Sequence, residues 1–249
     1  MDFQKSLVVP REIIFIIAEI MEIIAPQQIP KFISLCKSFQ RLFKNRVWNL
    51  QRLVTLENNT CIPHYEIKYR NIRFETLNLN SLDSKFFEMM RDSETIDFFS
   101  CQGIPKNFDY FMNCMKKCET LFLSANEIDG FILERFDELK KIHTLCLEYS
   151  DVRISEKSQN SLSKLKTIIF CGLNLRQMNL SAFANCDRVR FLYCVVSESR
   201  LSTLINVKHI ELIKCQGVTN SFGQDWVSCK VTIENCVPFL QCLNFENLF

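Results

Sequence analysis

Glycine is scarce in this chain, with 5 residues among 249. The glycines stand at positions 103, 130, 172, 217 and 223, so neither GxGxxG nor GxxxxGK[ST] can be written anywhere in the sequence. The glycine-rich loops that cradle nucleotide phosphates are therefore excluded. Histidine is scarcer still, at 3 residues, and no local signature links one of them to a particular Cys or Ser. We therefore predict no catalytic residue, no cofactor and no enzymatic activity.

The chain also lacks a large excess of charge and a long hydrophobic run. Its formal net charge of +2 gives no general basic field that would attract nucleic acid or an anionic membrane. The longest apolar candidate, Ile13 to Ile24, is interrupted by Glu19 and Glu22, and it is shorter than the about 18 residues of a spanning helix. The first residues do not resemble a signal peptide. We expect neither a nucleic-acid partner nor a membrane partner.

Cysteine, in contrast, is abundant, at 13 residues. Without a secretion signal, so many cysteines predict reduced thiols in the cytoplasm or nucleus rather than a disulfide framework. Structural zinc sites need two spaced ligand pairs, and only Cys114 and Cys118 fit even the first pair. We therefore predict no metal site, and we expect most cysteines to serve as small buried apolar residues.

A repeated apolar pattern occupies the chain from residue 74 onward. Eight segments obey L-x-x-L-x-L in a relaxed apolar alphabet, beginning at residues 74, 93, 118, 142, 165, 189, 207 and 228. Their sixth positions, at 79, 98, 123, 147, 170, 194, 212 and 233, are separated by 19, 25, 24, 23, 24, 18 and 21 residues. Most of these intervals lie in or at the edge of the range of about 20–29 residues found in leucine-rich repeats.

A second feature recurs in the same register. Cys101, Asn126, Cys215 and Cys236 stand three residues after the last apolar position of their units, where a leucine-rich repeat carries Asn or Cys. We interpret Cys194 as an inward-facing anchor at a sixth position. These segments resemble the cysteine-containing subclass of leucine-rich repeats. The resemblance implies an α/β solenoid with a parallel concave sheet and helices on the convex side.

The pattern also predicts which side chains reach the concave surface. Positions three and five of each unit point away from the core, because successive side chains of a strand alternate between its two faces. In the middle units these positions include an apolar group that we predict to bind a protein substrate: Phe122, Cys146, Ile169, Phe191 and Tyr193. Exposed apolar patches of this kind often mark binding surfaces.

The first 53 residues do not share the repeat. Pro10 is suited to the first turn of a helix that carries a wide apolar face, and Pro26 and Pro30 predict its end and the start of another. Three short helices in about 45 residues form little core of their own. The segment from Val9-Pro10-Arg11-Glu12-Ile13-Ile14 to Ile17, the phrase Ser34-Leu35-Cys36-Lys37-Ser38-Phe39, and Trp48 resemble an F-box.

The resemblance implies a non-catalytic substrate receptor of an SCF-type cullin RING ubiquitin ligase. The F-box would bind a Skp-family adaptor and, through it, the cullin and RING subunits, while the repeats would hold an unknown protein substrate. By position in the motif, the candidates for adaptor contact are Pro10, Glu12, Ile13, Ile14, Ile17, Leu35, Cys36 and Phe39. We expect an F-box-like module at 1–53, a linker or atypical first repeat at 54–70, and about eight irregular repeats with a C-terminal cap at 71–249.

Two other interpretations remain open from the sequence. The chain could be a leucine-rich-repeat scaffold whose N-terminal helices only seal the end of the solenoid. It could also be an enzyme with an unrecognised site, an interpretation that rests only on the three histidines and the many cysteines. The apolar tail, residues 237–249, either caps the last repeat or is a free interaction peptide.

Overall fold

The computed structural model describes residues 68–149 and 156–238, with short stretches at 14, 16–18, 20–21, 28, 47–48 and 54–57. Most of the predicted three-helix module at 1–53 lies outside the described residues. So do the tail from residue 239 and the segment around residues 65–67, where the sequence suggested an atypical first repeat. The fold below is therefore that of the predicted repeat region and of the strands leading into it.

A parallel sheet of nine strands runs through the described residues, and each strand lies beside the next one along the chain. The strands are β2 (Val54–Glu57), β4 (Asn71–Glu75), β5 (Thr95–Phe99), β6 (Thr120–Ser124), β7 (Thr144–Glu148), β8 (Thr167–Cys171), β9 (Arg188–Leu192), β10 (His209–Ile213) and β11 (Lys230–Glu234). A separate pair joins β1 (Val47–Trp48) to β3 (Lys68–Tyr69) in parallel. The large sheet thus begins at β2, inside the stretch that the sequence assigned to a linker or atypical repeat.

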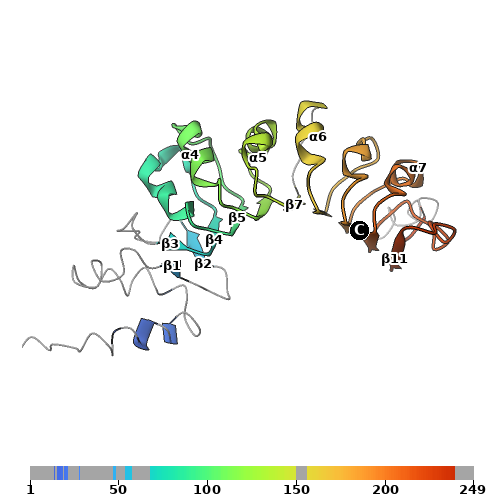
Figure 1. Ribbon diagram of the computed structural model, residues 1–249, viewed down its shortest axis with the longest axis horizontal. Helices are drawn as coiled ribbons and strands as arrows, with labels where there is room; N and C mark the ends of the chain where they lie inside the picture. The colour runs from blue at the N-terminus through green and yellow to red at the C-terminus, as the bar shows by residue number, and fades with distance from the viewer. Residues whose placement is uncertain are drawn as a thin grey trace, which may run out of the picture.

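Short helices connect the strands and lie on one side of the sheet. They are η2 (Leu79–Ser81), η3 (Ser84–Met90), α4 (Phe108–Cys114), α5 (Asp129–Glu134), η4 (Phe136–Glu138), α6 (Glu156–Leu162), η5 (Ser181–Phe183), α7 (Glu198–Leu201) and η6 (Ser202–Leu204). The units fan into an arc, with the helices on its outer side and the strands on its inner side (Figure 1). The predicted α/β class, with a parallel sheet and helices on its convex side, is confirmed.

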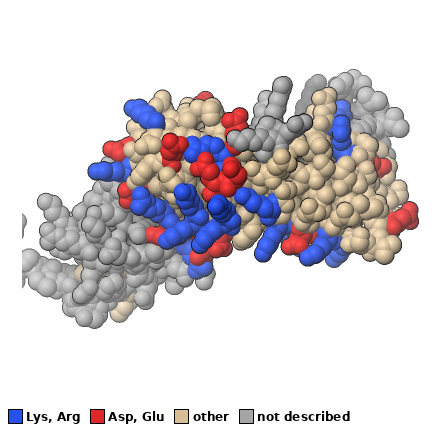
Figure 2. Space-filling view, turned by 45° about the horizontal axis from the view of Figure 1, so that its top comes forward, with Lys and Arg blue, Asp and Glu red and all other residues tan. Residues whose placement is uncertain are grey.

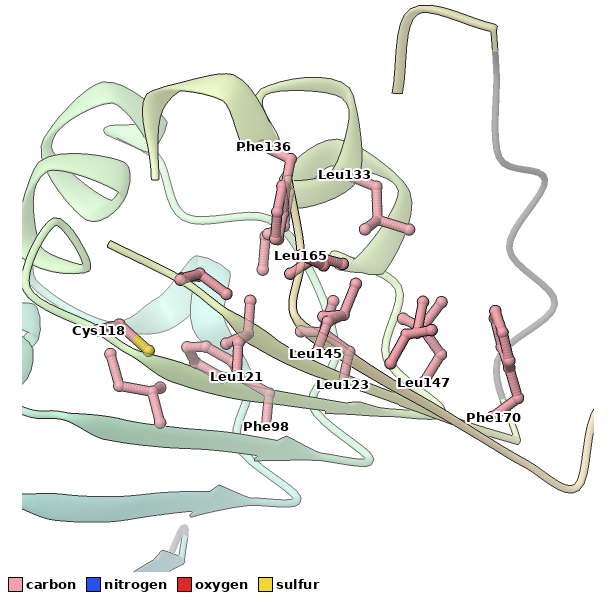
Figure 3. Packing of buried hydrophobic residues seen from close by; sticks show 14 of the residues in the cluster. Phe98, Cys118, Leu121, Leu123, Leu133, Phe136, Leu145, Leu147, Leu165 and Phe170 are labelled. Atoms are coloured by element: carbon pink, nitrogen blue, oxygen red, sulfur yellow. The ribbon is translucent and has the colours of Figure 1, made fainter. Parts of the chain in front are cut away.

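The core lies between the sheet and the helices and continues from unit to unit. Two alternate side chains of each strand from β4 to β10 point inward and are buried, as Ile96 and Phe98 are in β5. Leu121 and Leu145 approach Leu133 and Phe136 from α5 and η4 (Figure 3). Full burial of one such side chain contributes about 1.5–3 kcal/mol. Each unit therefore depends on its neighbours for its core.

The observed register corrects two of the predicted units. In the unit predicted to begin at residue 74, the strand is β4, Asn71–Glu75, so Thr76 follows the strand instead of lying in it. In the unit predicted to begin at residue 189, Thr167 pairs with Arg188 and Phe170 pairs with Phe191, which moves the register by three residues. The strands from β4 to β11 accordingly begin at residues 71, 95, 120, 144, 167, 188, 209 and 230, at intervals of 24, 25, 24, 23, 21, 21 and 21.

The chain leaves each strand from β4 to β11 through the same turn. The first residue after the strand has a positive φ, and seven of these eight residues are not glycine: Thr76, Ser100, Ala125, Tyr149, Gly172, Tyr193, Lys214 and Asn235. The backbone N–H of each, up to Lys214, donates to the carbonyl of the last residue of the next strand, at 2.7–3.0 Å. These bonds extend the ladder by one residue beyond the strands.

The residue after this turn fixes the turn from inside the core. The Cys101 thiol donates to the Phe74 carbonyl at 3.4 Å, and the Asn126 amide donates to the Phe98 carbonyl at 2.9 Å. Cys194, Cys215 and Cys236 donate in the same way to the strand before theirs, at 3.3–3.4 Å. The predicted positions of Cys101, Asn126, Cys215 and Cys236 are confirmed, whereas Cys194 belongs to this row and is not a sixth-position anchor.

Candidate functional site

The concave face carries one row of side chains from the middle residue of each strand. We call this set the central row, and the strand pairing aligns its members as Arg73, Asp97, Phe122, Cys146, Ile169, Arg190, Glu211 and Thr232. Because side chains alternate along a strand, the row lies on the side of the sheet opposite the helices. It therefore forms the surface available to a partner inside the arc.

Three of the predicted substrate-binding residues come together in this row. Phe122, Cys146 and Ile169 are direct cross-strand neighbours on β6, β7 and β8, and we call them the apolar strip. Phe122 and Ile169 are half-buried, while Cys146 is buried between them. Burial raises the pKa of Cys146 to about 12, so its thiol is neutral at physiological pH and is a poor nucleophile. The strip is thus an apolar contact surface.

The prediction was wrong for Phe191 and for the position of Tyr193. Phe191 is fully buried and stacks on Phe170 in the core, with ring centroids 5.4 Å apart. Tyr193 lies outside the central row, in the turn after β9, where it is exposed. The Lys214 ammonium group lies 5.2 Å from the centre of the Tyr193 ring. Tyr193 therefore belongs to the edge of the sheet where the strands end.

A second exposed tyrosine lies at this edge, and sequence reasoning missed it. Tyr149 occupies the turn after β7, two units before Tyr193. Its ring covers the backbone of Gly172, since a Cβ atom built on that glycine would lie 2.2 Å from the ring. Turn residues recur every 21–25 residues, and this spacing places Tyr149 and Tyr193 at equivalent positions. The sequence did not reveal it because the predicted register of β9 was wrong.

An ion-pair cluster adjoins the apolar strip on the side of β4 and β5. The Arg73 guanidinium lies 3.2 Å from the Asp97 carboxylate, 3.2 Å from that of Glu75, and 4.4 Å from the centre of the Phe99 ring. Asp97 is buried, and its Oδ1 accepts no hydrogen bond from the described residues. Burial, aided by the charges of Glu148 and Glu75 and opposed by Arg73, raises the pKa of Asp97 to about 6.

A second cluster adjoins the strip on the side of β9 and β10. The Glu211 carboxylate lies 2.6 Å from Arg190, 3.4 Å from Arg188 and 3.5 Å from His209. Two guanidinium groups share this carboxylate, so the cluster has an excess of positive charge. The concave face is therefore apolar in the middle and charged on both sides, which is the distribution typical of a protein-binding surface with an apolar centre and a polar rim.

The edge where the strands begin carries charges of both signs. Arg70 pairs with Glu94 at 2.6 Å, and Lys208 pairs with Asp187 at 2.7 Å. On the side of the molecule in view, Lys and Arg lie among Asp and Glu rather than in a field of one sign (Figure 2). Exposed pairs of this kind contribute about 0–1 kcal/mol each, so they affect solubility and orientation more than stability.

The described residues contain no group of three or more His, Cys, Asp or Glu side chains that could hold a metal ion. Within 68–149 and 156–238 every cysteine is buried and outside any disulfide. In the part of the chain that the structure describes, no helix is both long enough and apolar enough to cross a membrane.

Only two of the predicted adaptor-contact residues are described, Ile14 and Ile17, and they differ in exposure although they are about one turn apart on the same helical segment. Ile14 is 9% exposed and belongs to the core with Ala18, whereas Ile16, Ile17 and Ile20 are 54%, 38% and 48% exposed. We call these three residues the isoleucine face. The other candidates lie outside the described residues: Pro10, Glu12, Ile13, Leu35, Cys36 and Phe39.

Comparison with known proteins adds no relative to these observations. No protein-family model matches the chain, and no curated protein matches it. The geometry defines the chain as an α/β protein with a curved parallel sheet, and its surfaces are the basis on which a function can be assigned.

Proposed function

We propose that the chain is a non-catalytic substrate receptor of an SCF-type cullin RING ubiquitin ligase. In this proposal the N-terminal helices form an F-box that binds a Skp-family adaptor, and the stacked units are cysteine-type leucine-rich repeats that hold a protein substrate on their concave face. The receptor itself performs no chemistry. It raises the effective concentration of substrate lysines near the ubiquitin-loaded enzyme.

The observation that carries the proposal is the isoleucine face. Ile14 and Ala18 are one helical turn apart and are buried in the core, so this side of the helix is already covered by apolar residues of the same chain. Ile16 and Ile20 lie on the other side, Ile17 lies between the two sides, and all three are exposed. A helix that is apolar on two sides needs a second apolar partner. An adaptor surface would supply it.

The repeat geometry supports the other half of the proposal. The units recur every 21–25 residues, and a buried Cys or Asn follows the turn in most of them. Both features agree with cysteine-type leucine-rich repeats. The apolar strip between two charged clusters is the surface that we assign to the substrate.

Adaptor binding can be tested with two pairs of variants. We expect Ile16→Asp with Ile20→Asp to abolish co-purification with a recombinant Skp-family adaptor, because loss of central apolar anchors costs about 2 kcal/mol or more. Ile205→Asp is the matched control, since Ile205 is equally exposed but lies between α7 and β10. Failure of the unmodified chain to bind the adaptor, or unchanged binding by the double variant, would refute the ligase role.

Substrate capture can be tested on the concave face. Phe122→Ala with Ile169→Ala removes most of the apolar strip and leaves the core positions of β6 and β8 intact. We expect proteins that co-purify with the unmodified chain, identified by mass spectrometry, to be lost from this variant at an unchanged melting temperature. Retention of the same proteins would place substrate binding elsewhere.

One observation favours the alternative of a scaffold with a helical cap. Ile14 and Ala18 belong to the same buried cluster as the core of the sheet, as a sealing role for the helix would require. Adaptor binding separates the two functions. A scaffold would capture its partner through the apolar strip and would not bind the adaptor.

A further inference from the structure

The last strand of the sheet leaves its core side partly uncovered. Val231 and Ile233 on β11 align with Ile210 and Leu212 on β10. Ile210 and Leu212 are fully buried, but Val231 and Ile233 are only partly buried, although all four point to the same side of the sheet. Every other strand from β4 onward has a following unit that covers it, and β11 has none among the described residues.

The segment before β11 adds further apolar surface at the same end. Phe222 and Trp226 form an edge-to-face pair with ring centroids 4.9 Å apart, and both are partly buried. Phe222, Val231 and Ile233 line a hollow of about 220 Å³ together with Asn220, Gly223 and Gln224. We call Phe222, Trp226, Val231 and Ile233 the end face.

The backbone at this end is also open. Strand β11 pairs with β10 on one side, and its other edge has no partner strand among the described residues. An open sheet edge can pair with another chain, and native proteins normally cover or shield it. The end face thus needs an occupant that supplies apolar side chains and, along β11, backbone hydrogen bonds.

We propose that residues 239–249 of the same chain cover the end face and close the stack. This segment reads FLQCLNFENLF and contains six large apolar residues and one charge. The chain enters it directly from the open end, where the Val237 carbonyl accepts a hydrogen bond from the Gly217 N–H at 2.8 Å. Eleven extended residues reach about 36 Å, roughly twice the about 17 Å length of a five-residue strand. The segment can therefore turn back along β11 and still place side chains on the hollow.

The proposal can be tested with Trp226 as a reporter. The chain has two tryptophans, so Trp48→Phe leaves Trp226 as the only one. We expect a chain ending at Pro238 to show stronger acrylamide quenching of Trp226 and about tenfold faster amide hydrogen exchange over residues 230–234, as local opening predicts. A synthetic peptide of residues 239–249, added in excess, should restore both values.

Point variants in the full chain keep the test decisive where the shortened chain fails to fold. Phe245→Asp with Leu248→Asp should reproduce the loss of protection, whereas Asn244→Asp with Asn247→Asp adds the same charge to the same segment and should not. Unchanged quenching and exchange in Phe245→Asp with Leu248→Asp would overturn the proposal. Protection that disappears on dilution would overturn it too, because a second copy of the chain would then be the occupant. None of these outcomes depends on adaptor or substrate binding.

Discussion

The buried carboxylate of Asp97 should make the stability of the sheet depend on pH in an unusual direction. Asp97 lies on the concave face with one oxygen 3.2 Å from Arg73 and the other without a hydrogen bond from the described residues. Burial is the main cause of its raised pKa, and the Arg73 charge only partly offsets it. Asp97→Asn removes the titrating group and retains an oxygen that can accept from Arg73.

The sign and size of the effect follow from the two pKa values. The pKa of Asp97 is raised from 3.8 to about 6, so between pH 4 and pH 6 the folded protein binds this proton more tightly than the unfolded chain does. The favourable contribution is complete below pH 4 and is lost as the pH rises through 6. About two pKa units correspond to about 2–3 kcal/mol. The free energy of unfolding of the unmodified protein should therefore fall by about 2 kcal/mol relative to Asp97→Asn between pH 4 and pH 7.

The assay is urea unfolding followed by circular dichroism at half-unit steps from pH 4 to pH 7.5. Subtracting the free energy of unfolding of Asp97→Asn from that of the unmodified protein cancels the titration of the other groups. Asp225→Asn, at an exposed position, is the control for the loss of a carboxylate. A flat difference for Asp97→Asn, or one that rises with pH, would refute the reasoning.

Three further substitutions test the packing. Phe98→Ala should destabilise the fold by about 3–5 kcal/mol in urea unfolding, because Phe98 is fully buried. Asn126→Ala should cost about 2 kcal/mol and speed hydrogen exchange at Cys101, whose N–H donates to the Asn126 side chain at 2.8 Å. Gly172→Ala should lower the melting temperature, because its Cβ would meet the Tyr149 ring, and adding Tyr149→Ala should recover part of the loss.

The repeat could be predicted from the sequence, and its exact register could not. Apolar alternation placed six of the eight strands from β4 to β11 in the correct register. In these six, a Thr, His or Lys is followed by an alternating apolar pair, and that pattern fits only one register. Near Leu77 and Leu192 two registers satisfy the same apolar pattern, since the residues after the strand are also apolar. Choosing the wrong register exchanged core and surface for Phe191.

For the same reason, the sequence predicted only part of the candidate surface. Phe122, Cys146 and Ile169 come from units whose register was correct, and they form one cross-strand row. The ion-pair clusters around Asp97 and Glu211 depend on contacts between strands 21–24 residues apart in the chain. Composition and spacing along one strand do not determine such contacts, so the charged rim of the site required the three-dimensional structure.

The turns after the strands show how this chain adopts left-handed backbone with few glycines. Left-handed backbone costs about 1–2 kcal/mol at a residue with a Cβ atom, yet seven of the eight turn residues after β4 to β11 carry one. At each turn before the last, the backbone N–H of the turn residue donates to the next strand. In most units a buried Cys or Asn side chain also donates to a carbonyl of the preceding strand. These hydrogen bonds offset the cost of the left-handed backbone. Gly172 is the exception, because the Tyr149 ring occupies the space that a Cβ atom would need. Glycine is thus required at this turn by a side chain of the preceding unit rather than by the turn itself, because the exposed ring of Tyr149 lies against the Gly172 backbone.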